Sequence, residues 1–276
     1  MATKQKMRKD LLLKKRKDEA KSFDLIKMNN NRKRILLLGV YGMEMVECGG
    51  VLHKNASTGG VSHASILFAG PKMREGLQEA AKHLNCTVEY LDMKAEEISA
   101  SLEEKIKVIR VIRKFKPDII ITQDPEHCVS DLDPGRRPAQ TLLLEAMALC
   151  GRDMDIEGIR DLEPHRGFSV YYMTPEHPNC LVDINDSWKA KCDAMDSLES
   201  QLVFIAELAE GTPQERQYEL LIDGYAQMET RLERGRAMKR LMDQAYHLYH
   251  ASTGHNHVML SENYRKESLF VLDQLI

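Results

Sequence analysis

The sequence predicts a doubly wound α/β fold, in which a mainly parallel sheet is flanked by helices on both faces. Two observations predict it. Short, continuous apolar runs at 34–40, 64–68 and 118–122 are typical of strands buried on both faces of a parallel sheet. Stretches with apolar residues at helical spacing separate these runs, and strands that alternate with helices build such a sheet.

Each expected element follows from a local pattern. Six strands are expected, at 34–40, 64–68, 86–91, 118–122, 169–173 and 181–184. Helices are expected at 72–84, 95–115, 136–150 and 186–210, and over most of 213–249. A clear apolar stripe supports the second of these helices; it is formed by Ile98, Leu102, Ile106, Ile109 and Ile112. The C-terminal part is therefore expected to be mainly helical.

The domain organisation is simple, because no internal repeat or low-complexity linker divides the chain. We expect one α/β domain, residues 34–276, after an N-terminal extension, residues 1–33. A chain of 276 residues buries roughly three quarters of the surface that its unfolded form exposes. Every apolar run is shorter than the roughly 20 residues that cross a bilayer, and the start is too charged for a secretory signal. A cytoplasmic protein without a membrane span is expected.

The six cysteines lie far apart, without a C-x-x-C pair, at positions 48, 86, 128, 150, 180 and 192. This spacing argues against a thiolate zinc knuckle and against a redox dithiol. Buried, reduced thiols are expected, because a free cysteine packs as a small hydrophobic residue.

The charge is distributed unevenly. Residues 1–34 contain 13 Lys and Arg and 4 Asp and Glu, a net of +9, whereas the remainder has 26 and 38, a net of −12. The basic extension could contact nucleic acid or an anionic surface. Alternatively, it docks on the acidic body of its own or a neighbouring subunit in a homo-oligomer. Phe23 is the only aromatic residue available there for stacking, so nucleic acid is not the expected partner.

The first loop expected to carry chemistry follows the strand at 34–40, since ligands bind beyond the carboxyl ends of parallel strands. Gly49 and Gly50 open a helix whose free backbone N–H groups suit an anion, although tight helix–sheet packing explains the pair equally well. Glu44 and Glu47 lie where a pocket is expected, but acids in a first turn also stabilise the helix dipole.

The second loop, residues 123–137, is dense in groups that bind metals or transfer protons. These groups are Asp124, Glu126, His127, Asp131 and Asp133, and Arg136 and Arg137 open the next helix. A plain loop rich in turn-forming residues has a similar composition. His255 and His257 also resemble a ligand pair, although two histidines alone rarely make a metal site.

The order of strand, loop, Cys48-Gly49-Gly50 and helix resembles the PIG-L/LmbE deacetylase family. The similarity continues at Arg74-Glu75, Glu79-Ala80, Pro117-Asp118-Ile119, Val170-Tyr171-Tyr172, Val182-Asp183-Ile184, Ser200-Gln201 and Ser261-Glu262-Asn263-Tyr264. It covers about residues 33–270. The resemblance implies an LmbE-like, Rossmann-like fold and zinc-dependent hydrolysis, in which two His and one Asp hold the metal, a second Asp is the base and a further His stabilises the oxyanion.

The chain departs from this family at each of those positions. Tyr41 stands at the first zinc-binding His, Met43 at the base Asp and Glu44 at the ligating Asp. Asp133 stands at the oxyanion-stabilising His and Arg136 at the second ligating His. An arginine cannot give up its proton to bind a cation. The zinc site is therefore expected to be degenerate.

Three hypotheses follow. In the first, a small polar or anionic ligand, sugar- or carboxylate-like, binds without a cofactor. Its binding residues are Tyr41, Gly49, Gly50, Asp124, Arg136, Arg137 and His165, and any metal-free hydratase or lyase chemistry uses Glu44, Asp133 and His127. In the second, a rearranged site binds zinc or another divalent ion, and the protein deacylates an amino-sugar-like substrate. The residues that would hold the ion are Glu44, Glu47, Asp124, His127, Asp131 and Asp133. In the third, the protein is a non-catalytic structural or regulatory oligomer.

Overall fold

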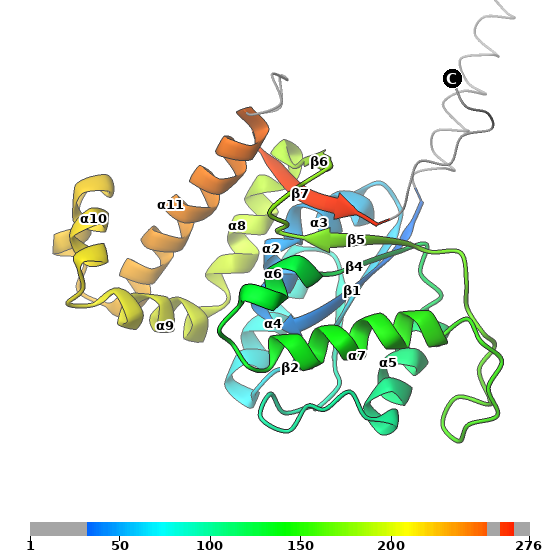
Figure 1. The fold of residues 1–276 in the computed structure, drawn as a ribbon. Coiled ribbons are helices and arrows are strands. Elements are labelled where there is room, and N and C mark those ends of the chain that lie inside the picture. Colours follow the sequence, from blue (N-terminus) through cyan, green and yellow to red (C-terminus); the bar gives the residue numbers. More distant parts are fainter. Residues whose placement is uncertain (1–31, 253–259, 268–276) are drawn as a thin grey trace, which may run out of the picture.

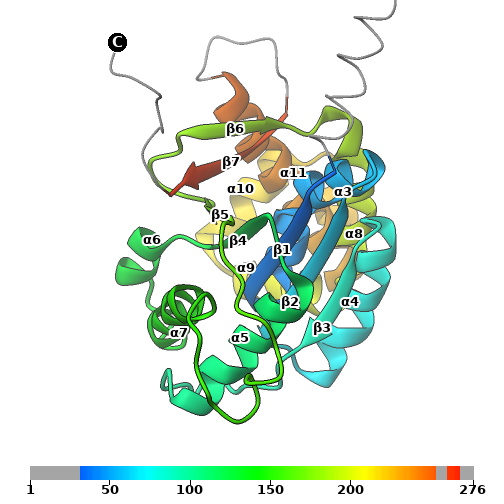
Figure 2. The same ribbon diagram turned by 90° about the vertical axis from the view of Figure 1, so that its right-hand side faces the viewer.

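Seven strands form one sheet in the computed structural model, which describes residues 32–252 and 260–267 (Figures 1 and 2). The strands are β1 (Arg34–Tyr41), β2 (Val61–Phe68), β3 (Thr87–Tyr90), β4 (Ile119–Gln123), β5 (Ser169–Met173), β6 (Cys180–Asp183) and β7 (Ser261–Lys266). Their order is β3-β2-β1-β4-β5-β7-β6, with β1 to β5 parallel and β7 antiparallel to both its neighbours. The predicted doubly wound, mainly parallel sheet is confirmed.

Helices cover both faces of this sheet. They are α2 (Met43–Glu47), α3 (Gly49–Ser57), α4 (Pro71–His83), α5 (Leu102–Phe115), α6 (Pro125–Ser130), α7 (Arg136–Leu149), α8 (Trp188–Asp196), α9 (Glu199–Ala209), α10 (Pro213–Leu221) and α11 (Arg231–Ser252), with single 3-10 turns at Asn185–Ser187 and Tyr225–Gln227. Helices α3, α4 and α8 lie on one face and α5 and α7 on the other (Figure 2). Helices α9 and α10 lie away from the sheet, whereas α11 reaches back to pack against β7, which confirms a helical C-terminal part (Figure 1).

The strands alternate between two apolar cores. Ile35 and Leu37 pack toward α3, α4 and α8, whereas Leu36 and Leu38 pack toward α5 and α7. All four are buried, and full burial of one such side chain stabilises the fold by about 1.5–3 kcal/mol. Two buried faces explain why these strands have continuous apolar sequences.

The prediction of a helix from residue 95 was wrong in its start. Helix α5 begins at Leu102, because Ser101 and Glu104 form a capping box: the Ser101 hydroxyl accepts from the Glu104 N–H, and the Glu104 carboxylate accepts from the Ser101 N–H. Ala100 has a φ of 55°, a left-handed conformation that cannot continue a helix backwards.

The single helix expected at 186–210 was also wrong, since α8 and α9 are separate. Leu198 leaves the helical conformation between them and is fully buried. Helix α4 packs closely against this break, because a Cβ at Gly76 would lie 2.5 Å from the Ser197 carbonyl oxygen. Tertiary packing therefore ends α8 where the sequence pattern is still helical.

Strand β7 was not predicted as a strand. Its sequence, SENYRK, is polar, yet Ser261, Glu262, Asn263 and Tyr264 are all buried between β5 and β6. The apolar pattern that reveals the other strands is absent here, since hydrogen bonds and ion pairs satisfy this strand.

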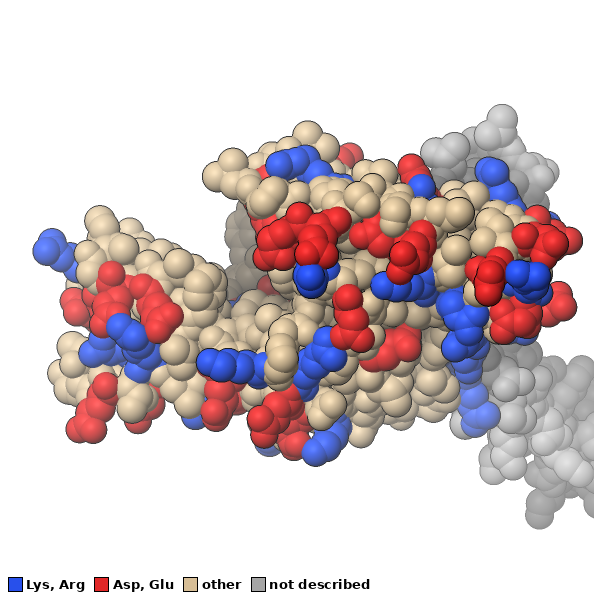
Figure 3. Space-filling view, turned by 90° about the horizontal axis from the view of Figure 1, so that it is seen from below, with Lys and Arg blue, Asp and Glu red and all other residues tan. Residues whose placement is uncertain are grey.

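Several predictions fall partly or wholly outside the described residues, namely the basic extension up to residue 31, and His255 and His257. The extension's docking and the homo-oligomer stay predictions. All six cysteines are free, four of them buried, as expected. Among the described residues, no helix combines the length and apolar character needed to cross a membrane. Lys and Arg are interspersed with Asp and Glu over the face shown in Figure 3.

Candidate functional site

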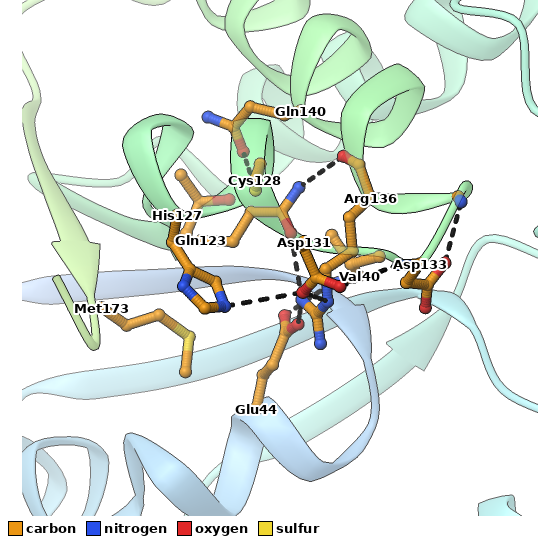
Figure 4. Close-up of polar contacts among 12 residues, drawn as sticks. Val40, Glu44, Gln123, His127, Cys128, Asp131, Asp133, Arg136, Gln140 and Met173 are labelled. Carbon is orange, nitrogen blue, oxygen red and sulfur yellow. Dashed lines mark hydrogen bonds and ion pairs between the residues drawn. The ribbon is translucent and has the colours of Figure 1, made fainter. Parts of the chain in front are cut away.

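An ion pair between Arg136 and Glu44 lies at the carboxyl ends of β1 and β4 (Figure 4). The Arg136 Nη1 atom is 2.7 Å from the Glu44 Oε1 atom, and the other Glu44 oxygen accepts from the Val40 N–H at 2.7 Å. Glu44 belongs to α2, directly after β1, and is only 3% exposed. Arg136 is the first residue of α7. Two distant loops thus meet through one buried carboxylate, as their positions after neighbouring strands predict.

The Arg136 guanidinium has further partners that fix its orientation. Its Nε atom lies 3.0 Å from the Asp131 Oδ2 atom. Its Nη1 atom also donates to the Gln123 side-chain oxygen at 3.0 Å, and the Gln123 amide donates back to the Arg136 carbonyl at 3.0 Å. The guanidinium stacks over the ring of Tyr41, with its carbon 5.2 Å from the ring centroid. Two carboxylates therefore balance one guanidinium.

The protonation states follow from burial and from these partners. Burial raises the pKa of the Glu44 carboxyl, while the Arg136 guanidinium and the Val40 N–H act in the opposite direction. Burial lowers the pKa of Arg136, but the Glu44 and Asp131 carboxylates act in the opposite direction and the net shift is upward. Burial also raises the pKa of Tyr41, helped by a hydrogen bond to Asp133, so the phenol keeps its proton.

The second loop supplies the remaining members of what we call the strand-end cluster. The His127 Nε2 atom is 3.5 Å from the Asp131 Oδ2 atom, so Asp131 lies between His127 and Arg136. Asp133 accepts from the Gly135 N–H at 2.8 Å, which shapes the turn before α7. The cluster consists of Tyr41, Glu44, Gln123, His127, Asp131, Asp133 and Arg136.

Other predicted site residues have separate surroundings. Asp124 caps α6 and forms an ion pair with Arg265 at 2.8 Å. Arg137 is exposed and donates to the Asp131 carbonyl. The His165 Nε2 atom lies 2.7 Å from the Pro117 carbonyl oxygen, at the amino end of β4 and so at the opposite end of that strand.

The glycine pair at the start of α3 also has an internal partner. The N–H groups of Gly50 and Val51 donate to the two carboxylate oxygens of Glu262, at 2.7 and 2.9 Å. The Lys191 ammonium and the Tyr264 hydroxyl donate to the same carboxylate, at 2.7 and 2.8 Å. The anion expected at this helix N-terminus is therefore a side chain of β7. A Cβ at Gly50 would lie 2.7 Å from it, which explains the glycine.

Comparisons with known proteins agree with this fold. No family model matches the chain. Among curated proteins, the diacetylchitobiose deacetylase of Thermococcus kodakarensis is 30% identical over 118 residues, or 41% of this chain and 43% of that protein. The match thus spans less than half of the relative's length.

Two solved structures extend the comparison. The N,N'-diacetylchitobiose deacetylase of Pyrococcus horikoshii superposes with a TM-score of 0.62 and 17% identity, over 85% of this chain and 83% of its own. The 4-carboxy-2-hydroxymuconate hydratase of Pseudomonas putida gives a TM-score of 0.62 and 15% identity, over 88% and 100%. The fold of this chain is PIG-L/LmbE-like. At these identities the structural likeness establishes the fold, and the activity has to be argued from the site.

In this PIG-L/LmbE-like protein, the residues present do not fit zinc. Of the three positions that the family resemblance assigns to ligands, Tyr41 holds a phenol whose raised pKa keeps it protonated, and Arg136 holds a permanently charged guanidinium that lies directly on Glu44. The alternative set of six is divided, because Asp124 binds Arg265 and Glu47 faces Lys239 at 3.9 Å. Among the described residues, no group of three or more His, Cys, Asp or Glu is arranged to hold a metal.

Sequence reasoning missed Gln123, Lys191 and Arg265. Gln123 ends a strand and has no charge, so nothing distinguished it from a buried strand residue. Lys191 lies on α8 and Arg265 on β7, far in sequence from their carboxylate partners. The only available signal was the family-like Ser261-Glu262-Asn263-Tyr264 segment, which indicates that the residues of β7 belong to the folded domain.

Proposed function

We propose that this PIG-L/LmbE-like protein binds a small polar molecule without a metal ion and has lost the zinc-dependent N-deacetylation that the family resemblance implies. The observation that carries the proposal is the ion pair between Arg136 and Glu44, at two positions where the family resemblance implies zinc ligands. A guanidinium is permanently charged, so it supplies at this point a fixed positive charge in place of the metal.

The energetics support the same conclusion. A metal ion could reach Glu44 only after the guanidinium had left it, and separating this partly exposed ion pair costs about 2 kcal/mol. Arg136 would also lose its bonds to Asp131 and Gln123. The incoming ion would gain only oxygen ligands from scattered loops, so the exchange is unfavourable.

The charge balance favours a polar ligand over an anionic one. Glu44 and Asp131 already neutralise Arg136, so an added carboxylate would meet two fixed negative charges within the cluster. Tyr41 and Asp133, which the resemblance aligns with family site positions, offer a hydroxyl and a carboxylate as hydrogen-bonding groups. Sugar-like hydroxyls suit these groups.

A second candidate is metal-free acid–base catalysis. His127 is half exposed and lies beside Asp131, which can orient its ring. This pair could transfer a proton in a hydration or elimination, in line with the hydratase among the structural neighbours, although that neighbour supports the fold alone. Loss of turnover in His127→Gln, with ligand binding intact, would support this candidate.

Zinc analysis and a deacetylation assay test the main proposal. The purified chain is incubated with excess zinc, dialysed and analysed for metal, and then assayed with N,N'-diacetylchitobiose. We expect substoichiometric zinc and no acetate release. A variant with the family's residues serves as the positive control for metal binding; it carries Tyr41→His, Met43→Asp, Glu44→Asp, Asp133→His and Arg136→His. Stoichiometric zinc in the unaltered chain, with acetate release that Glu44→Gln abolishes, would overturn the proposal.

A further inference from the structure

A cavity of about 400 Å³ lies beside the strand-end cluster, between the end of β5, the start of β7 and the helix α11. Met173, which ends β5, lines this cavity and also lies beside the cluster in Figure 4. The cavity is therefore at the carboxyl edge of the sheet, where ligands of such folds bind. Its volume is within the range of small-molecule sites, about 300–1,000 Å³.

An unsatisfied buried donor points to a ligand in this cavity. Asn263 lines it and is only 3% exposed. Its side-chain oxygen accepts from the Ser261 hydroxyl at 3.2 Å, but its amide nitrogen has no hydrogen-bond partner among the described residues. A buried N–H group without a partner costs free energy, which a ligand oxygen would recover.

His247 supplies an acceptor in the same cavity. Its Nδ1 atom lies 2.7 Å from the Ser261 carbonyl oxygen, which can only accept, so Nδ1 carries the proton and Nε2 is the acceptor atom of the ring. Burial, together with the Lys191 ammonium, lowers the pKa of His247 to about 3, so the ring is neutral at physiological pH. A donor and an acceptor thus line one cavity, on β7 and α11.

The charges around the cavity disfavour an anion. Glu47, Asp243 and Glu262 line it against only two ammonium groups, Lys191 and Lys239. Lys191 is paired with Glu262 and Lys239 with Asp243, and Glu47 is 3.9 Å from the already paired Lys239. A ligand carboxylate would find no free cation among these lining groups.

The apolar walls suit a planar ligand. The thioethers of Met173 and Met242 and the ring of Tyr246 line the cavity. Methionine sulfur makes favourable contacts with aromatic rings and adapts to ligand shape. Thr174, also on the wall, has a φ of 45°, a strained conformation for a β-branched residue that tends to mark functional sites.

We propose that this cavity binds a small, uncharged, planar molecule that carries an adjacent hydrogen-bond acceptor and donor, of the aromatic carboxamide class. The carbonyl oxygen accepts from the Asn263 amide, the amide N–H donates to the His247 Nε2 atom, and the ring lies between the methionines. This inference goes beyond the proposed function, because the cavity lies beside the strand-end cluster, shares no lining residue with it and takes a different class of ligand.

Benzamide and benzoate test it, because they share a shape and differ in charge and donor capacity. Binding to the full chain is followed by titration in heteronuclear NMR. We expect saturable shifts with benzamide and affinity for benzoate at least about tenfold weaker, a difference of about 1.4 kcal/mol. Equal affinities, or no binding of benzamide up to its solubility limit, would overturn the proposal.

Two tryptophan variants locate the binding. Met242 is part of the cavity wall yet partly exposed, so Met242→Trp should fold and fill the space, weakening benzamide by about tenfold or more. Leu220→Trp on α10, where the side chain is 86% exposed, is the matched control and should leave the affinity within about twofold. Unchanged binding in Met242→Trp contradicts the assignment.

The outcome is separable from that of the proposed function. Zinc analysis of the same samples reports on the Glu44–Arg136 pair, whereas the benzamide titration reports on the cavity. Stoichiometric zinc together with benzamide binding would refute only the metal-free function. Absence of both zinc and benzamide binding would refute only the cavity ligand.

Discussion

Two buried carboxylates, Glu262 and Glu44, lie against or at the same glycine-containing loop, and their surroundings differ. Glu262 accepts from four donors, all internal, and its cation Lys191 is only 2% exposed in its side chain. Glu44 accepts from Val40 and Arg136, and the Arg136 side chain is 22% exposed and shared with Asp131. The first carboxylate joins β7 to α3 and α8. The second lies at the carboxyl edge of the sheet, at a position where the family resemblance implies a zinc ligand.

From this difference we infer a structural role for the Lys191–Glu262 pair and a functional role for the Arg136–Glu44 pair. The Lys191–Glu262 pair lies on the cavity wall, but internal donors already saturate its carboxylate, so its role is to position β7. A pair open on one side can exchange a partner for a ligand group. Removing Lys191 should therefore lower stability more than ligand binding, whereas removing Arg136 should lower ligand binding more than stability.

The largest effect is expected from Lys191→Met. It leaves the Glu262 carboxylate buried without its ammonium, and removing one partner of a buried pair destabilises by about 3–5 kcal/mol. Urea unfolding followed by circular dichroism measures the loss. Lys189→Met on the same helix, whose side chain is exposed beside Asp193, should cost less than about 1 kcal/mol. Similar costs for the two variants would contradict the structural role of the Lys191–Glu262 pair.

Arg136→Met should cost less, about 2 kcal/mol, because the guanidinium is partly exposed and water can reach part of the gap. The double variant with Glu44→Gln should recover part of this cost, since the uncompensated carboxylate is then gone. A double-mutant cycle in urea measures the coupling. Arg137→Met, one residue along and exposed, is the control. An additive cycle would show that the pair at the zinc-ligand positions does not form in solution.

The pH dependence of stability should separate the cavity from the strand-end cluster. His247 has its pKa lowered from 6.5 to about 3, mainly by burial. Because its folded pKa lies below the unfolded one, its stabilising contribution is complete above 6.5 and is lost as the pH falls toward 3.

Between about pH 7 and about pH 5, His247 alone should therefore remove about 2 kcal/mol of the unfolding free energy. Urea unfolding at the two pH values measures it, and His247→Gln should remove that part of the difference. His83→Gln, at an exposed position of α4, should leave it unchanged. An identical pH dependence in His247→Gln would mean that the ring is not buried as a neutral group.

Sequence reasoning predicted the parts of the molecule that depend on apolar pattern. Leu36 and Leu38 belong to a continuous apolar run, and such runs identified β1 and β4 directly. The meeting of Glu44 with Arg136 was also foreseeable in outline, because both follow neighbouring parallel strands. Its form as a direct ion pair was not, since that depends on side-chain geometry.

Polar elements were beyond the same reasoning. Strand β7 is stabilised by Glu262 and its four donors, and the nearest of these is two residues away while the farthest is separated by 212. No periodic pattern of residues within the strand predicts such long-range contacts. His165 was placed with the ligand-binding residues because it is polar and near an arginine, but chain direction puts it at the amino end of β4. A polar residue in a loop can therefore lie at either end of a neighbouring strand, and sequence composition alone does not show which.

The smallest expected effect concerns two residues with left-handed backbones, Thr174 at the cavity and Lys116 at the end of α5. Their φ values are 45° and 52°, and both side chains are exposed. Glycine adopts this conformation without steric cost, so each change to glycine should stabilise the fold by about 1 kcal/mol or less. Thermal unfolding measures the gain.

The two sites should differ in binding. Lys116 simply ends a helix, so Lys116→Gly should raise the melting temperature and leave the benzamide affinity unchanged. Thr174 lines the cavity, and glycine there would release the constraint on the wall, so Thr174→Gly should weaken benzamide even as it stabilises the chain. If both variants gained stability with benzamide affinity intact, the strain at Thr174 would be a property of the turn after β5 and not of the ligand site.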